Sequence, residues 1–374
     1  MIFPWHEREW AQLWQAKLNQ RLPHALLFLG ARGLGKMQFA DRFSQALLCE
    51  NINADLQRFQ GYREDNTAPA IDPHNPVLHG LLDNLGNPVN QHHKKCCGTC
   101  HACRLTTNRT HPNLLWIEPE KTGQAIKVDQ IRMLAEFTQQ SSFQGDYRIV
   151  IIHPAHAMNI NAANALLKTL EEPSPGVLLI LISDQSQPLL PTLLSRCQRI
   201  LFAQPEKEIA LSWLKQELKK TEKDILFDAD LLLRLAKGAP LSALEFAENN
   251  FFLKRRHLMQ ALYLLNQHQE DPLQLAASFE DIDIISLIDM ISTWILDVIW
   301  LAQQVNPDQI VNQDFLKELD IVKARTNMQT NIESIDYLCE LRGQLCAGIN
   351  LNKRLVIESI FIRWMNKGVE NYKR

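Results

Sequence analysis

The feature that most constrains the fold of this chain is a glycine-rich loop near its amino terminus. An apolar stretch from His24 to Leu29 runs directly into Gly30-x-x-x-x-Gly35-Lys36, with Gly33 inside the loop. This spacing is typical of a strand that turns into a helix, where backbone N–H groups and a lysine surround phosphate oxygens. The sequence therefore predicts a phosphate-binding loop made of Gly30, Gly33, Gly35 and Lys36. Two interpretations stay open: a nucleotide still binds there, or the loop is kept only for its strand-to-helix geometry.

The residues that would make such a loop hydrolytic are missing. Met37 stands where a Ser or Thr hydroxyl would ligate Mg²⁺, and a thioether is a poor ligand for a hard cation. A nearby buried strand should end in carboxylates that hold the metal and orient the attacking water. The best candidate strand, residues 148–152, is followed instead by His153-Pro-Ala-His156. We therefore expect no Mg²⁺ site, at most weak binding of ATP or ADP, and no hydrolysis by this chain alone.

The order of apolar patterns predicts an α/β fold followed by an all-α region. Strand-like runs lie at 114–118, 149–152, 177–182 and 199–202, and amphipathic helices are expected at 128–139 and 161–171. This alternation indicates a doubly covered parallel sheet that ends near Phe202. Beyond Pro205 the strand signal disappears, and short helices over 206–247 precede a helical remainder from about 251 to 374. Residues 50–95, rich in Asn, Asp, Pro and Gly, are expected to form a long surface loop.

Composition narrows the class of protein further. The formal net charge of −3 argues against a chain coated for nucleic-acid binding. The amino terminus carries charged residues and tryptophans where a signal peptide would need an uninterrupted apolar stretch. The most apolar long segment, 284–305, includes Asp289 and Asp297, which favours a buried helix over a membrane span. We expect a cytoplasmic protein with no membrane contact.

A cluster of cysteines indicates a metal site. Cys97-x-x-Cys100-x-x-Cys103 has the spacing that brings thiolates together on one tetrahedral ion, and structural zinc is the favoured interpretation. An iron–sulfur cluster is disfavoured because Thr107 stands where a fourth nearby cysteine would be needed. The alternative is a set of reduced thiols. The spacing leaves the fourth ligand open, with Cys96, His101, His92 and His93 as candidates.

Two further strings carry a resemblance to a known family. Ala162-Ala-Asn-Ala-Leu-Leu-Lys-Thr-Leu-Glu-Glu-Pro173 and Leu193-Leu-Ser-Arg-Cys-Gln198 closely resemble segments of the bacterial DNA polymerase III clamp-loader ATPases. The resemblance implies an AAA+ P-loop domain over 1–203 with a zinc-binding insertion at about 50–110. It also implies a small helical lid domain over 204–249 and a helical collar domain over 250–374. The implied assembly is a hetero-oligomeric ring with tau/gamma and delta subunits, which places a sliding clamp on primed DNA during replication.

The resemblance also implies roles for individual residues. Arg196 would be an arginine finger that reaches in trans into the ATP site of a neighbouring subunit, and Ser195 would position it. The alternative for Arg196 is a surface arginine in a weak ion pair. Cys49, at the end of the helix after the loop, would be the fourth zinc ligand beside Cys97, Cys100 and Cys103. The turn at 238–243 resembles the family's sensor segment but lacks its arginine, which favours a loop that no longer binds nucleotide.

These features together predict a non-hydrolysing clamp-loader subunit that belongs to a DNA polymerase holoenzyme and has no activity of its own. A hydrolysis-competent subunit of the tau/gamma type is the alternative within the family. From other classes, a zinc-dependent nucleic-acid-binding module on an inactive nucleotide fold and a P-loop kinase or ATPase with an unusual metal site stay open. Hydrolysis of ATP by the isolated protein would favour the ATPases, and salt-sensitive DNA binding without partners would favour the nucleic-acid module.

Overall fold

The computed structural model describes residues 3–52, 96–121, 124–139, 147–184, 189–220, 228–249, 251–306, 309–346, 349 and 351–366. Most of the expected loop at 50–95, including His92 and His93, lies outside these residues. The chain forms two compact units, Met1–Ala210 and Leu211–Arg374. The boundary between a lid and a collar inside the second unit stays a prediction.

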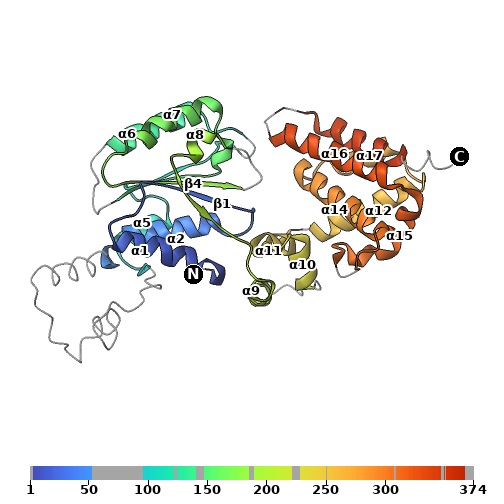
Figure 1. Cartoon of the computed structure of the whole chain (residues 1–374), viewed down its shortest axis with the longest axis horizontal. Coiled ribbons are helices and arrows are strands. Elements are labelled where there is room, and N and C mark those ends of the chain that lie inside the picture. Colours follow the sequence, from blue (N-terminus) through green and yellow to red (C-terminus); the bar gives the residue numbers. More distant parts are fainter. Residues whose placement is uncertain are drawn as a thin grey trace, which may run out of the picture. The chain divides into compact units, whose positions relative to one another are not determined.

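The first unit is a parallel sheet with helices on both faces (Figure 1). The five strands are β1 (Ala25–Gly30), β2 (Leu114–Ile117), β3 (Arg148–Ile152), β4 (Val177–Asp184) and β5 (Gln198–Leu201), in the spatial order β2-β3-β4-β1-β5. The helices are η1 (Pro4–His6), α1 (Glu7–Leu18), α2 (Lys36–Leu48), α5 (His101–Thr107), α6 (Val128–Gln139), η2 (Ala155–Ala157), α7 (Ile160–Glu171) and α8 (Pro191–Leu194). The expected parallel, doubly covered sheet is confirmed.

Both faces of the sheet are buried, which explains the continuous apolar runs of its strands. On one face, side chains of β1, β3 and β4 pack with Ile131 and Leu134 of α6 and with Leu166 of α7. On the other face, Phe28 of β1 makes an edge-to-face contact with Phe39 of α2, at a ring-centroid distance of 5.5 Å. The Asn159 side chain accepts a hydrogen bond from the Ala162 amide at 2.8 Å and so caps the start of α7.

The register of the central strands determines what surrounds the glycine-rich loop. β1 lies between β4 and β5 and is parallel to both. Gly30, the last residue of β1, pairs with Asp184, the last residue of β4. A side chain at Gly30 would meet the carbonyl oxygen of Phe202, which lies 2.5 Å from the position of a Cβ atom. The loop therefore leaves the carboxyl edge of the sheet between an acidic residue and the end of β5.

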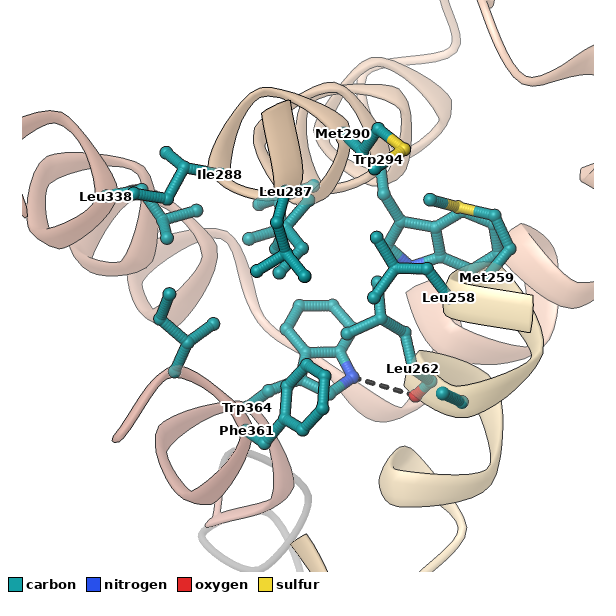
Figure 2. Close-up of a cluster of buried hydrophobic side chains, with 14 of the residues drawn as sticks. Leu258, Met259, Leu262, Leu287, Ile288, Met290, Trp294, Leu338, Phe361 and Trp364 are labelled. Atoms are coloured by element: carbon teal, nitrogen blue, oxygen red, sulfur yellow. Dashed lines mark hydrogen bonds between the residues drawn. The ribbon is translucent and has the colours of Figure 1, made fainter. Parts of the chain in front are cut away.

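The second unit is helical throughout its described part. It holds the end of α9 (Lys207–Lys220), then α10 (Ala229–Leu235), α11 (Pro240–Glu248), α12 (Phe251–Asn266), α13 (Pro272–Ala277), α14 (Ile284–Ala302), η4 (Gln313–Phe315), α15 (Leu316–Arg325), α16 (Met328–Cys346) and α17 (Lys353–Asn366). Its core joins α12, α14, α16 and α17, and the indole N–H of Trp364 donates to the Leu262 carbonyl at 2.8 Å (Figure 2).

Among the described helices, α14 alone is long and apolar enough to cross a membrane. Half of its most apolar 18-residue stretch is buried in the protein. Leu287, Ile291 and Trp294 of this helix are at most 1% exposed and belong to the core of the second unit. The apolar character of α14 therefore serves the interior of a helical unit, as its acidic residues predicted.

A buried polar network fixes the segment between α14 and α15. Arg255 of α12 is 2% exposed, donates through two nitrogens to Asn312 Oδ1, and pairs with both carboxylate oxygens of Asp314 at 2.7 Å. Asp297 of α14 accepts hydrogen bonds from the amides of Val311 and Asn312 and from the Asn312 side chain. Burial raises the pKa of Asp297, and these hydrogen bonds oppose the shift. The network satisfies its charged groups inside the fold.

Candidate functional site

Lys36 lies beneath the glycine-rich loop, with its ammonium group directed at protein oxygens. Its Nζ donates to the carbonyls of Gly30 and Ala31, both at 2.7 Å, and to Asp184 Oδ1 at 2.9 Å. These three acceptors match the three hydrogens of an ammonium group. The side chain is 5% exposed, and burial lowers the pKa of Lys36 while the Asp184 carboxylate opposes that shift. A phosphate group would have to compete with this pairing for the lysine.

The amino-terminal segment covers the other end of the same loop. Gly35 has φ +93°, in the left-handed region, and a Cβ atom built there would lie 2.6 Å from a ring carbon of Phe3. The Phe3 and Trp5 rings stack at a centroid distance of 4.9 Å, and Trp5 Nε1 donates to the Leu34 carbonyl at 2.9 Å. The backbone at the start of α2, where a phosphate would bind, is therefore packed against aromatic side chains of the same chain.

His6 completes this aromatic cover. Its ring is 2% exposed, and neither ring nitrogen has a hydrogen-bond partner of normal geometry within the described part of the chain. Phe39 and Phe202 contact it edge-on at centroid distances of 5.4 and 5.0 Å. Burial lowers the pKa of His6 to about 4; an interaction with the Leu34 backbone opposes this shift, and the nearby Lys36 charge adds to it. His6 is therefore a neutral, buried ring at neutral pH.

Histidines occupy the place after β3 where a hydrolase would carry acids. His156 Nδ1 lies 3.1 Å from Ser183 Oγ, and His153 Nδ1 lies 3.9 Å from a carboxylate oxygen of Glu118. Burial lowers the pKa of both histidines, and neighbouring carboxylates partly oppose this. The acid that does lie at this edge, Asp184, comes from the neighbouring strand β4 and pairs with Lys36. Asp184 was not predicted from the sequence, because acids were expected at the end of β3.

Four cysteines meet at one point, as the sequence analysis expected. The Sγ atoms of Cys49, Cys97, Cys100 and Cys103 all lie within 4.8 Å of one another. The Cys49–Cys100 and Cys97–Cys103 sulfur separations are 4.0 and 3.9 Å. A tetrahedral zinc ion with Zn–S bonds of about 2.3 Å requires sulfur atoms about 3.8 Å apart. The donor set therefore fits zinc, and Cys49 supplies the fourth sulfur across the 53–95 segment.

The thiols of this cluster differ in how readily they ionise: burial raises the pKa values of Cys49 and Cys103, whereas local hydrogen bonds lower that of Cys97. Backbone amides of Cys100 and Cys103 donate to the sulfurs of Cys97 and Cys100 at 3.3 and 3.4 Å. The pKa of Cys97 is lowered to about 6, because hydrogen bonds from the Cys100 and Thr99 amides and the Thr99 hydroxyl outweigh the effect of burial. Cys96 instead points its Sγ at Gln45 Oε1, at 3.4 Å. Anionic sulfurs are the form that binds metal.

Arg196 is half-buried at a different place in the first unit, just before β5. Its Nη2 pairs with Glu171 Oε1 at 2.6 Å, and its Nη1 donates to the Thr192 carbonyl at 3.1 Å and lies 3.4 Å from Ser195 Oγ. The Ser195 hydroxyl itself donates to the Thr192 carbonyl at 3.0 Å. Cys197, the next residue, is buried, and its burial raises the pKa of the thiol to about 11.

The sheet separates Arg196 from the chain's own glycine-rich loop. β5 is parallel to β1, and its first residue, Gln198, pairs with Leu26 near the start of β1. Arg196 therefore lies at the amino edge of the sheet, whereas the loop follows Gly30 at the carboxyl edge. With a rise of about 3.3 Å per residue, the two levels are about 20 Å apart along the strands. Arg196 cannot reach a phosphate bound at this chain's own loop.

A P-loop on a five-stranded parallel sheet in the order β2-β3-β4-β1-β5, with helices on both faces, is the architecture of the P-loop nucleotide-binding proteins. The family model described as DNA polymerase III, delta subunit matches residues 82–206, and the model described as DNA polymerase III, delta subunit, C terminal matches residues 249–366. The chain belongs to the family of DNA polymerase III delta' subunits.

Similarity to individual members extends along nearly the whole chain. The delta' subunit from Pseudomonas aeruginosa is 29% identical over 97% of this chain and 97% of its own length. The delta' subunit from Yersinia pestis is 31% identical over 72% of this chain and 79% of its own length. The delta' subunit from Escherichia coli is 27% identical over 96% of this chain and 94% of its own length.

Proposed function

We propose that this chain is the non-hydrolysing subunit of a DNA polymerase III clamp loader and that it supplies Arg196 to the ATP site of a neighbouring subunit. In this assignment it forms a cytoplasmic ring with tau/gamma and delta subunits and helps place the sliding clamp on primed DNA. The single observation that carries the proposal is the position of Arg196, partly exposed at the sheet edge opposite the chain's own loop.

The state of the chain's own loop supports the absence of hydrolysis. Met37 offers no hydroxyl to Mg²⁺, and Lys36 is paired with Asp184 and two loop carbonyls. Phe3 lies against Gly35, where the backbone would have to meet phosphate oxygens. The interpretation that the loop is kept for its strand-to-helix geometry therefore has more support than nucleotide binding.

The chemistry of Arg196 suits a role in trans. A guanidinium is planar and permanently charged, so it can stabilise the charge that develops on a transferring γ-phosphoryl group. Ser195 would position it through the hydrogen bonds that both residues make at the Thr192 carbonyl. An arginine finger of this kind raises phosphoryl transfer by about 10³–10⁵-fold in well-studied nucleotide hydrolases.

The test is the ATPase rate of a ring reconstituted from this chain with tau/gamma and delta. Arg196→Ala is expected to leave ring assembly intact and to lower turnover sharply in the presence of clamp and primed DNA. Arg199→Ala is the matched control, because Arg199 is an exposed arginine in the same segment that contacts the Leu194 carbonyl. Unchanged turnover with Arg196→Ala, or ATP hydrolysis by the isolated chain, would refute the proposal.

We further propose that the four cysteines hold a structural zinc ion. Such an ion would join the end of α2 to the segment that begins α5 and would close the 53–95 insertion at its base. Metal analysis of the purified chain is expected to find one zinc per chain, lost in Cys49→Ser and kept in Cys339→Ser, whose cysteine is exposed. Equal metal content in the two variants would exclude Cys49 as a ligand.

A further inference from the structure

The contacts of Arg196 point to a second residue that acts on the same reaction. Glu171 is the last residue of α7, and its carboxylate pairs with Arg196 Nη2 at 2.6 Å. Among the described residues, Glu171 is the acid that contacts this guanidinium. It belongs to a different element from the finger and lies far from it along the chain.

The three acceptors around Arg196 hold its guanidinium from two directions. The Thr192 carbonyl and the Ser195 hydroxyl contact Nη1, and the Glu171 carboxylate contacts Nη2. A guanidinium has five N–H donors, so donors remain for a phosphoryl oxygen while these contacts persist. Arg196 can therefore keep these contacts within its own subunit and still donate a hydrogen bond to a phosphoryl oxygen.

The helices that carry these acceptors are anchored in the core, although the Glu171 side chain itself is 51% exposed. Leu166 and Leu170 bury α7 in the core of the first unit, and Leu193 does the same for α8. A free arginine side chain at a surface has many rotamers, and ordering it opposes every contact that it makes. An arginine already fixed by groups on two packed helices loses less freedom when it meets its target.

We propose that Glu171 is a positioning residue for Arg196, which fixes the guanidinium in the orientation that meets the γ-phosphoryl group in the neighbouring subunit. This inference rests on the proposed function, because it concerns the reaction that Arg196 would serve. Glu171 acts on the arginine and makes no contact with nucleotide. If Glu171 acts in this way, loss of its carboxylate weakens catalysis only through Arg196.

The test uses the full ring with clamp and primed DNA, and it measures kcat and the KM for ATP. Glu171→Ala is expected to lower kcat about two- to fivefold, a modest change because partly exposed ion pairs contribute little. The KM for ATP is expected to stay unchanged, because the finger acts on the transition state and the altered residue does not touch bound ATP. Glu171→Gln, which keeps an acceptor oxygen without the charge, is expected to lose less. Glu172→Gln is the matched control, since it removes the adjacent carboxylate, and it is expected to behave as wild type.

A double-mutant cycle separates positioning from a general structural effect. In a ring that carries Arg196→Ala, adding Glu171→Ala is expected to cause no further loss, because the group that Glu171 acts on is gone. An unchanged kcat with Glu171→Ala, or an equal loss in the Arg196→Ala background, would overturn the inference. A raised kcat would also overturn it, because Glu171 would then withhold the finger. If Arg196→Ala itself has no effect, the proposed function fails instead.

Discussion

His6 provides a sharp test of the aromatic cover over the glycine-rich loop. The ring is surrounded by Phe3, Trp5, Phe39 and Phe202 at centroid distances of 5.0 to 5.8 Å, and all four contacts are edge-on. Because neither ring nitrogen has a partner of normal geometry in the described part of the chain, His6→Phe removes only a weak interaction with the Leu34 backbone. The substitution keeps an aromatic ring of similar shape and removes the titratable group.

The expected effect follows from the pKa of His6. Burial lowers that pKa from its ordinary value of 6.5 to about 4. Between these two pH values, the unfolded chain therefore binds a proton at this histidine and the folded chain does not. The stability contributed by the neutral ring is therefore fully present above pH 6.5 and is lost as the pH falls towards 4. Linkage gives about 3 kcal/mol for the whole interval.

The measurement is the free energy of unfolding of the full chain between pH 4 and pH 8, by calorimetry, for wild type and His6→Phe. The half-buried histidines His153 and His156 also have lowered pKa values, so the wild-type profile alone does not isolate His6. The difference in unfolding free energy between wild type and His6→Phe isolates the contribution of His6. It is expected to shift by about 3 kcal/mol in favour of His6→Phe as the pH falls from 6.5 to 4. His268→Asn, which alters an exposed histidine, is expected to follow wild type. Parallel curves for wild type and His6→Phe would refute a buried, neutral His6.

Three further substitutions, one of them with a glycine control, test other contacts by unfolding of the full chain. Lys36→Met is expected to lower the free energy of unfolding by about 2–4 kcal/mol, because it leaves a carboxylate and two carbonyls unpaired; a loss below about 0.5 kcal/mol would contradict a structural role for the lysine. Gly30→Ala is expected to destabilise by about 1–3 kcal/mol, since its Cβ would lie 2.5 Å from the Phe202 carbonyl oxygen. Gly343→Ala, where the added Cβ meets nothing within 4 Å, should be neutral or stabilising, and equal effects of the two alanines would contradict the close approach at Gly30. Arg255→Met is expected to cost about 2–4 kcal/mol by leaving the buried Asn312 oxygen and the partly exposed Asp314 carboxylate without this partner, and an unchanged urea midpoint would show that the network contributes nothing.

Much of the fold could be predicted because its signals are local. The strands β3 and β4 are almost continuous apolar runs, because a strand that is buried on both faces has apolar side chains on both. The helix α6 was expected at its observed bounds, since Ile131 and Leu134 recur at helical spacing on its buried face. The meeting of three cysteines follows in the same way from a spacing that fits within one turn and the start of α5.

The remaining site features depend on contacts between residues far apart in the sequence. Lys36 and Asp184 meet only because β1 and β4 are neighbours in the sheet. No single segment of the sequence determines the order of the strands. Nothing in the local sequence says that Phe3 lies against Gly35 or that Trp5 donates a hydrogen bond to the Leu34 carbonyl. Cys49 was found through resemblance, because the chain between it and Cys97 gives no spacing from which to choose it.

The opposite placement of Arg196 and the glycine-rich loop has a consequence for the order of an assembly. A protein with two unlike edges binds its neighbours head to tail, and such contacts repeat around a ring with a fixed direction. Under the proposed function, a subunit with a half-buried Arg196 at one edge and a covered loop at the other would act on the ATP site of one neighbour and would hold no working ATP site for the other neighbour to act on. Under the proposed function this chain is therefore a terminus within a closed ring. It would mark one end of the series of ATP sites around the ring, so that these sites would have a defined order.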